Sequence, residues 1–400
     1  MVNSKLTLSR MIEFAIYAYM FAFIVLPGGS GTTPVKITRV ILMALLLLYV
    51  FYDKKIRLPF YVMAYVLFLL YNVIMIDFAD YKSYAVDHTL SILYVIAINV
   101  FLYQYLTKHN IIRRILICFI IFSFLSATYV FARYGLLVFM NSRKTDFGSA
   151  NLLGFYCAVS FTLSFVFCGK YKGLKKYFFV MMAIMSLIFV ILSASRKAVI
   201  YFSIPIVITY ILKSKNPILM LRNIVIGLSI LFVIYQAIMR ISFLYDIVGS
   251  RIETMINGFF GEDSDSSTET RLGLIEAGVQ WFKEKPIFGH GLHNFKPINM
   301  ARRDSIFYAH NNYIEMLVDC GIVGTIIYYI PYLIILKDCA VRLKTKQTDV
   351  AVIFGLMISF LIGEYGMVTY DLAIYHLLIL LFYILTKQQS VMSKNDRSGV

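Results

Sequence analysis

The chain has 400 residues, of which 60% are hydrophobic and only 15% are charged. Soluble domains are about half apolar and about a quarter charged, so this composition excludes an ordinary soluble domain and indicates a polytopic protein of the lipid bilayer. The net charge of +16 would suggest a nucleic-acid partner in a soluble protein. No basic helix or base-stacking module is present, so no nucleic acid is expected, and the cations instead mark cytoplasmic loops and anionic headgroups.

A membrane-spanning helix needs about 20 mostly apolar residues. About 12 such stretches are present, near 11–27, 37–52, 58–76, 86–106, 111–132, 150–168, 177–193, 197–212, 220–240, 311–336, 350–364 and 367–386. No low-complexity linker divides them. The sequence therefore predicts an all-α integral membrane protein in which residues 1–400 form a single polytopic domain.

The lysines and arginines in the connections predict the orientation, because cytoplasmic loops are enriched in them. With the N-terminus in the cytoplasm, most of the 38 lysine and arginine residues fall on the inner side. Both termini are then cytoplasmic, in a protein of the cytoplasmic (inner) membrane. The long segment 241–310, between the ninth and tenth predicted spans, becomes a large extracytoplasmic loop.

The long loop has helical patterns of its own. Apolar residues at helical spacing over 241–259 predict an amphipathic helix on the membrane surface. Ser266 and Glu269 have the spacing of a capping box, which predicts the start of a second helix. Pro286 would end that helix. Trp281, the single tryptophan, suits the membrane interface.

His310 is the first candidate for a catalytic residue. It precedes Asn311 where an apolar helix is expected to begin at the outer side of the membrane. The ordinary pKa of histidine, about 6.5, allows it to act as a general base near neutral pH. A helix-entry histidine bonded to backbone is the alternative. Glu315 and Asp319, further along the helix, could orient the base, bind substrate or pair within the bundle.

Arg196 is the second candidate. It lies with Lys197 in the run SASRK, a short connection on the predicted outer side between two long apolar stretches. Charges at such a membrane rim are functional candidates, and arginine can hold phosphate oxygens through paired hydrogen bonds without losing its proton. A residue that snorkels at a helix end is the alternative.

Five further cations could join the same anionic site. Arg271 lies in the first turns of the second loop helix, and Arg302 and Arg303 follow later in the loop. Arg143 and Lys144 lie in an earlier loop on the same predicted side. Apart from Arg271, each of these is equally consistent with a solvated surface.

Three histidines of the loop raise the alternative of a metal site. His290, His293 and His310 could hold zinc together with a nearby acid. Their spacing is unfavourable, because His290 lies between two glycines and no helical His pair of the HExxH kind is present. No metal and no cofactor are therefore expected.

A longer pattern joins these candidates. It consists of SASR at 193–196 and of Arg271, Trp281, Pro286, Gly289, Gly291, His310, Asn311, Leu317, Gly321 and Gly324. This pattern resembles the signature region of the O-antigen ligase and O-antigen polymerase superfamily. Asp146, Asn151 and Gly154 are similar, more weakly, to a polar loop of the family.

The resemblance implies an integral membrane glycosyltransferase that uses a polyprenyl-diphosphate-linked oligosaccharide on the outer face of the cytoplasmic membrane. It implies that His310 removes the proton of the acceptor hydroxyl. It also implies that Arg196 and Arg271 stabilise the departing diphosphate, with Arg302, Arg303, Arg143, Lys197 and Asn311 contacting substrate. Direct displacement would invert the anomeric centre.

Three functions remain open at this point. A polymerase would transfer the glycan to a lipid-linked repeat unit, with a chain-length regulator or a flippase as a partner. A ligase would transfer it to a lipid or protein acceptor. A flippase or other transporter would use charges within the helices, and Glu13, Asp371 and His376 keep that alternative open.

Overall fold

The computed structural model describes residues 2–27, 31–136, 138–141, 144–146, 148–213, 216–242, 245–250, 253, 266–343 and 347–395. These residues form two compact units. Unit 1 contains Met1–Leu45, Asn110–Ser264 and Cys339–Phe360, and unit 2 contains Leu46–His109, Asp265–Asp338 and Leu361–Val400. Both units are built from membrane-type helices, and three of these helices run from one unit into the other: α2 (Thr33–Asp53), α15 (Asn312–Arg342) and α16 (Thr348–Glu364). A single polytopic domain over 1–400 remains a prediction.

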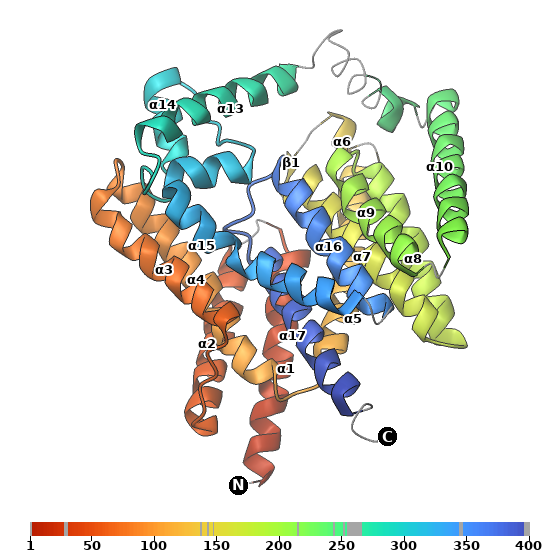
Figure 1. Ribbon diagram of the computed structural model, residues 1–400, viewed down its shortest axis with the longest axis horizontal. Coiled ribbons are helices and arrows are strands. Elements are labelled where there is room, and N and C mark those ends of the chain that lie inside the picture. Colours follow the sequence, from red (N-terminus) through yellow and green to blue (C-terminus); the bar gives the residue numbers. More distant parts are fainter. Residues whose placement is uncertain are drawn as a thin grey trace. The chain divides into compact units, whose positions relative to one another are not determined.

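Unit 1 is mostly helical. Its elements are α1 (Val2–Val25), most of α2 (Thr33–Asp53), α5 (Ile112–Tyr134), α6 (Val138–Asn141), α7 (Ala150–Lys170), α8 (Leu174–Leu192), α9 (Arg196–Lys213), α10 (Pro217–Arg240), a π-helix (Tyr245–Gly249), the end of α15 (Asn312–Arg342) and most of α16 (Thr348–Glu364). A two-residue hairpin, β1 (Lys144–Thr145) and β2 (Gly148–Ser149), leads into α7 (Figure 1). Ser149 then caps α7, since its hydroxyl accepts the Leu152 N–H at 3.2 Å.

Unit 2 contains the candidate residues Arg271 and His310. Its elements are the end of α2 (Thr33–Asp53), α3 (Phe60–Met75), the short 3-10 helix η2 (Ile76–Phe78), α4 (Lys82–Leu106), α13 (Ser266–Glu284), α14 (Phe295–Arg303), most of α15 (Asn312–Arg342) and α17 (Ala373–Asn395). Within it, α4 packs against both α3 and α17.

The prediction of an all-α membrane protein is confirmed. Each of the predicted spans overlaps a helix of the structure. In the described part of the chain, eight helices are long and apolar enough to cross a membrane. The exact number of twelve spans remains a prediction.

Helix α7 is the centre of unit 1, where it packs against α5, α8 and α9 (Figure 1). Small residues allow this close packing and hydroxyl groups pair across it, as is usual between membrane helices. Ser160 of α7 and Ser186 of α8 lie 3.1 Å apart, oxygen to oxygen, and both are buried. Gly154 of α7 leaves room for the turn that precedes α9, because a Cβ there would lie 2.8 Å from the Ser193 hydroxyl.

The second helix of the long loop is confirmed as α13, which begins at Ser266 and ends at Glu284, just before Pro286. Trp281, predicted at the membrane interface, is instead 4% exposed. It packs edge-on against Phe295 of α14, with 5.0 Å between ring centroids, in a small apolar core of the loop. Most of the predicted amphipathic helix over 241–259 lies outside the described residues.

Helix α15 is broken at Gly321, where φ is +62° and ψ is −170°. The break frees backbone N–H groups, and the loop after α13 supplies acceptors for them. Ile322 donates to the Pro286 carbonyl at 2.9 Å, and Val323 donates to the Ile287 carbonyl at 3.2 Å. In the other direction, His290 donates to Val318 at 2.9 Å. The loop and the broken part of α15 therefore exchange backbone hydrogen bonds, as two neighbouring strands do.

Gly321→Ala is expected to lower the free energy of unfolding by more than about 1 kcal/mol, the loss typical where alanine must adopt a positive φ. A Cβ at Gly321 would also lie 2.3 Å from the Ile287 carbonyl oxygen. Gly227→Ala is the matched control, because no atom lies within 4 Å of its Cβ position and alanine favours helix. Thermal unfolding in detergent measures both, and equal midpoints for the two variants would contradict this account of the break.

Candidate functional site

Asp319 anchors the loop that leads into α14. Its carboxylate accepts the backbone N–H groups of His293 and Phe295, both at 2.7 Å. Phe295 is the first residue of α14, so this contact satisfies an amide at a helix N-terminus, where intrahelical partners are lacking. Asp319 is 1% exposed. Its described partners are backbone groups of the long loop, a role that the sequence did not predict for Asp319.

Glu315, one turn earlier on α15, holds the segment that carries the candidate base. One carboxylate oxygen accepts the Ala309 N–H at 2.9 Å, and the other accepts the Tyr370 hydroxyl at 3.5 Å. The side chain is 1% exposed. Because Ala309 immediately precedes His310, this buried carboxylate fixes the chain at the entry to the candidate base.

His310 itself has a φ of +53°. Residues other than glycine rarely adopt this left-handed conformation, and such strain is concentrated at functional sites. The His310 side chain is half-buried, and its ring centroid lies 4.0 Å from that of Tyr308. The local backbone therefore holds the imidazole in a defined direction.

Asn311, predicted to contact substrate, caps α15. Its side-chain oxygen accepts the N–H groups of Tyr313 and Ile314 at 3.0 and 3.2 Å, which is the pattern of a helix N-cap. Asn311 is 2% exposed. The cap fixes the turn on the C-terminal side of His310, and substrate contact by Asn311 remains a prediction.

Arg271 belongs to the same electrostatic environment as Tyr308. Burial, together with the nearby carboxylate of Glu315, raises the pKa of Tyr308 to about 12, and the Arg271 guanidinium partly opposes this rise. Asp371 also acts on Tyr308 and raises its pKa further. Unit 2 thus brings Arg271, Tyr308 and His310 into one neighbourhood.

A buried carboxylate, Glu364, ties the start of α15 to the turn after α16. Its two oxygens accept four hydrogen bonds, from the hydroxyls of Tyr329, Tyr332 and Thr369 at 2.7, 2.6 and 2.8 Å and from the Asn312 amide at 3.2 Å. Glu364 is 0% exposed. A carboxylate in such a place is costly unless it is fully hydrogen-bonded, and the described contacts meet that requirement.

Both ring nitrogens of His290 contact groups of the protein. One ring nitrogen lies 2.6 Å from the Asp80 carboxylate and the other 2.8 Å from the Trp281 carbonyl oxygen. These two contacts hold the His290 ring between the segment just before α4 of unit 2 and the end of α13. Burial alone would raise the pKa of Asp80, but its hydrogen bonds with Lys285 and His290 lower it below its usual range.

His293 faces a different set of groups. Its Nδ1 lies 2.8 Å from the Tyr370 hydroxyl and 3.8 Å from the Glu315 carboxylate. Its ring stacks on that of His88 with 3.4 Å between centroids. Burial, with the nearby charges of His88 and Lys296, lowers the pKa of His293 to about 3. His293 is therefore neutral at physiological pH.

The two adjacent arginines of the loop both contact α13. Arg302 forms a paired contact with the Glu284 carboxylate, with one N···O distance of 2.8 Å, and its guanidinium lies 5.9 Å from the Trp281 ring. Arg303 donates to the Gly273 carbonyl at 2.6 Å. These contacts hold α14 against α13, and a direct contact of either arginine with substrate remains a prediction.

Arg196 begins α9 in unit 1, and the turn before it is tightly built. The Ser195 hydroxyl donates to the Asn151 side-chain oxygen at 3.0 Å, and the Ser193 hydroxyl donates to the Val190 carbonyl at 2.7 Å. Arg196 and Lys197 are both half-buried. Asn151 and Gly154, which the sequence connected only weakly to the site, thus pack directly against the SASR turn.

The earlier outer loop is described only in part. Arg143 lies outside the described residues. Lys144 is described through the backbone pairing of β1, opposite Ser149. Asp146 accepts a hydrogen bond from the Tyr134 hydroxyl at 2.9 Å, so this weakly matched residue belongs to the loop's own structure.

Two of the three titratable residues that left a transporter open, Glu13 and His376, have partners in the structure. Glu13 lies 2.8 Å from Arg114 and also accepts the Tyr17 hydroxyl. His376 lies 3.0 Å from the Tyr65 hydroxyl, and its other nitrogen lies 2.8 Å from a backbone carbonyl oxygen. Both sets of contacts join helices within one unit.

The sequence missed Tyr308, Tyr370 and Glu364 as members of the site. Tyr308 lies two residues before His310, and this proximity was the signal that could have revealed it. Glu364 is the last residue of an apolar helix and Tyr370 follows that helix, and neither had a motif around it. Their importance depends on partners far away in the chain.

The helices and the loop that folds against them define a multi-pass, all-α membrane protein with a polar cluster on one long loop. A family model described as O-antigen ligase matches residues 180–329, from within α8 to within α15. The match includes Arg196, Arg271 and His310, and it confirms the resemblance to the O-antigen ligase and O-antigen polymerase superfamily. No curated protein matches the chain.

Proposed function

We propose that the protein is a glycosyltransferase that polymerises lipid-linked glycan repeat units at the outer face of the cytoplasmic membrane. The observation that carries the proposal is the build of the His310 turn. Glu315 fixes its N-terminal side through Ala309, and the Asn311 cap fixes its C-terminal side. A positioned and strained histidine inside the stretch that matches the family model suits a general base.

In the proposed reaction, His310 takes the proton from a hydroxyl of the acceptor repeat unit. The acceptor oxygen forms a bond to the anomeric carbon while the bond from that carbon to the polyprenyl diphosphate breaks, which inverts the centre. Arg271 and Arg196 each stabilise negative charge on the leaving diphosphate, which is preorganised electrostatic catalysis. Arginine suits this role because it stays charged and can donate in pairs.

A ligase is the second candidate, and the description of the matching family model favours it. It would use the same base and cations but would transfer the finished glycan to a lipid or protein acceptor. The two reactions differ in what accumulates when the base is lost. A polymerase without His310 leaves single repeat units on the polyprenyl carrier, whereas a ligase without it leaves long chains there.

The deciding experiment measures glycan length on the carrier in cells whose sole copy is the His310→Ala variant. Single repeat units on the carrier would support the polymerase. Long carrier-linked chains with no attachment to a final acceptor would overturn it in favour of the ligase. Normal glycan export with unchanged chain length would remove His310 from the reaction, and loss of lipid-linked repeats from the outer face would support a flippase instead.

The proposal requires the loop 241–310 to be extracytoplasmic and both termini to be cytoplasmic. Cysteines introduced at Ser264 and Ser393, in a variant without the five native cysteines, test this orientation. An impermeant thiol reagent applied to whole cells should label position 264 and leave 393 unlabelled until the membrane is opened. The reverse pattern would invert the orientation and place the candidate base on the wrong side.

A further inference from the structure

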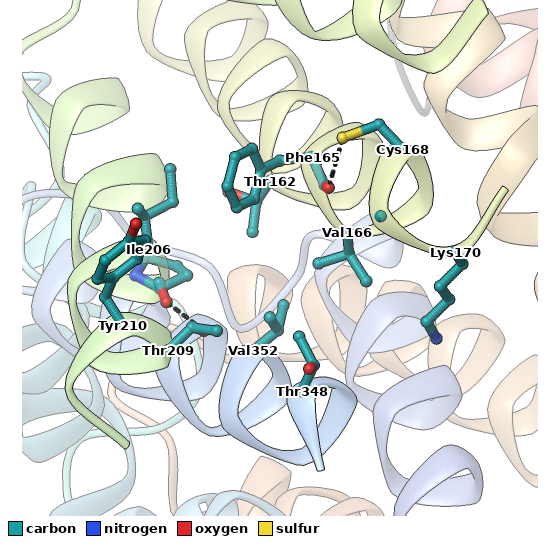
Figure 2. A pocket seen from close by; sticks show the side chains of 12 residues that line it. Thr162, Phe165, Val166, Cys168, Lys170, Ile206, Thr209, Tyr210, Thr348 and Val352 are labelled. Atoms are coloured by element: carbon teal, nitrogen blue, oxygen red, sulfur yellow. Dashed lines mark hydrogen bonds between the residues drawn. The ribbon is translucent and has the colours of Figure 1, made fainter. Parts of the chain in front are cut away.

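A cavity of about 280 Å3 lies inside unit 1, among α7, α9 and α16. Figure 2 shows its side chains, and Val166, Ile206 and Val352 are among the apolar ones. The lining also includes Lys170, the last residue of α7, and Thr348, the first residue of α16. The cavity therefore lies at the end of the helices that is remote from the SASR turn before α9.

Helices α9 and α16 are in close contact beside the cavity. Gly355 lies against Pro205, since a Cβ on Gly355 would be 2.5 Å from the Pro205 Cα. Pro205 itself lines the cavity. Proline removes a backbone donor from a helix interior, and the Thr209 hydroxyl donates to the Pro205 carbonyl at 2.6 Å. This hydrogen bond occupies one of the polar groups of the cavity wall.

Two further polar groups of the wall are also engaged by the protein. The Cys168 thiol donates to the Phe165 carbonyl at 3.0 Å, and Lys170 forms an ion pair with Asp349. The wall thus presents apolar groups to its occupant. Phe165 and Tyr210 are 45% and 53% exposed, so the wall continues onto the outer surface of helices, of which α7 is apolar and long enough to cross a bilayer. A helix surface that faces the bilayer is surrounded by lipid acyl chains, so an acyl chain is the apolar group available to fill this cavity.

Positive charge lies next to the cavity. The segment 170–176, KYKGLKK, has four lysines and no acidic residue. Lys170 is paired with Asp349, whereas Lys172, Lys175 and Lys176 are exposed. Clusters of lysine beside a membrane helix attract anionic headgroups. The apolar wall and the adjacent cations together match the two parts of an anionic phospholipid.

We propose that this cavity is a binding site for an anionic phospholipid of the surrounding bilayer. An acyl chain occupies the space between α7, α9 and α16, and the headgroup phosphate lies at Lys172, Lys175 and Lys176. The site is separate from the proposed glycan transfer, because it lies at the opposite end of α9 from Arg196.

The test measures phospholipid retained by the purified protein. The full chain is incubated with vesicles of phosphatidylglycerol or of phosphatidylcholine, repurified, and examined by native mass spectrometry. We expect wild type to retain phosphatidylglycerol at least about tenfold better than phosphatidylcholine. Val166→Trp and Ile206→Trp, which fill the cavity independently, should each lose the retained lipid. Ile184→Trp is the matched control on α8, because Ile184 is 55% exposed and lies outside the cavity.

The headgroup contact is tested separately. Replacement of Lys172, Lys175 and Lys176 together by serine should leave lipid retention in place but remove the preference for phosphatidylglycerol. Wild-type retention by a monodisperse cavity-filled variant would overturn the acyl-chain site. Equal retention of both lipids by wild type would overturn the anionic headgroup. These outcomes do not depend on glycan transfer, so failure here leaves the proposed enzyme untouched.

Discussion

His310→Ala is expected to lower turnover by about two to four decades, the usual contribution of a positioned general base. The reason is that the chain is fixed on both sides of His310, by the hydrogen bond from Ala309 to Glu315 and by the Asn311 cap of α15. No other described residue lies between these two contacts. The measurement is steady-state transfer by the purified protein, supplied with lipid-linked repeat units. The loss should appear in kcat and not in the apparent KM, because the alanine variant keeps the arginines that hold the donor.

A matched histidine controls for nonspecific damage. His109 is half-buried in unit 2, and its Nδ1 lies 2.9 Å from the Tyr105 carbonyl oxygen, at the end of α4 remote from the long loop. His109→Ala should leave turnover close to that of wild type, because the described hydrogen bond of His109 is to Tyr105 and not to a group of the long loop. Equal turnover by the His310 and His109 variants would remove His310 as the base.

Arg271→Lys and Arg196→Lys should each slow transfer by roughly ten- to a hundredfold, although both keep the positive charge. Lysine is a point charge and cannot reproduce the paired grip of a guanidinium on phosphate oxygens. Loss of charge-assisted hydrogen bonds worth about 1.5–3 kcal/mol gives this range, with about 1.4 kcal/mol for each decade of rate.

The same substitution at an exposed arginine serves as control. Arg222 lies on α10 and is exposed, so Arg222→Lys should transfer at the wild-type rate. All variants are compared at equal levels of protein in the membrane. Near-normal rates for both Arg271→Lys and Arg196→Lys would remove these residues from the diphosphate site. A slower rate for Arg271→Lys alone would keep Arg271 in that site and remove Arg196 from it.

Glu315 explains why the candidate base can keep its strained backbone. A single hydrogen bond to the Ala309 amide restrains the chain just before His310, and the Asn311 cap restrains it just after. The same α15 carries Asp319, whose two contacts hold the start of α14. Two acids spaced four residues apart thus hold two separate segments of the long loop against one helix.

The sequence alone determined the class of protein, the places of its helices and the stretch that carries the candidate base. Apolar runs and the residues that begin or end a helix are local features of the sequence. Ser266 and Pro286 therefore predicted the two ends of α13 correctly. The motif from Arg271 to Gly324 was also recognisable, because its residues lie within one continuous segment that the family model matches in large part.

The tertiary structure decided which polar groups meet. His290 pairs with Asp80, 210 residues away, and Ser195 pairs with Asn151, 44 residues away. Trp281 is buried against Phe295 because α14 folds over α13, which the pattern within α13 could not indicate. A buried polar or aromatic side chain needs a partner to offset its loss of water, and a sequence pattern reports the burial of a position without naming the distant residue that completes it.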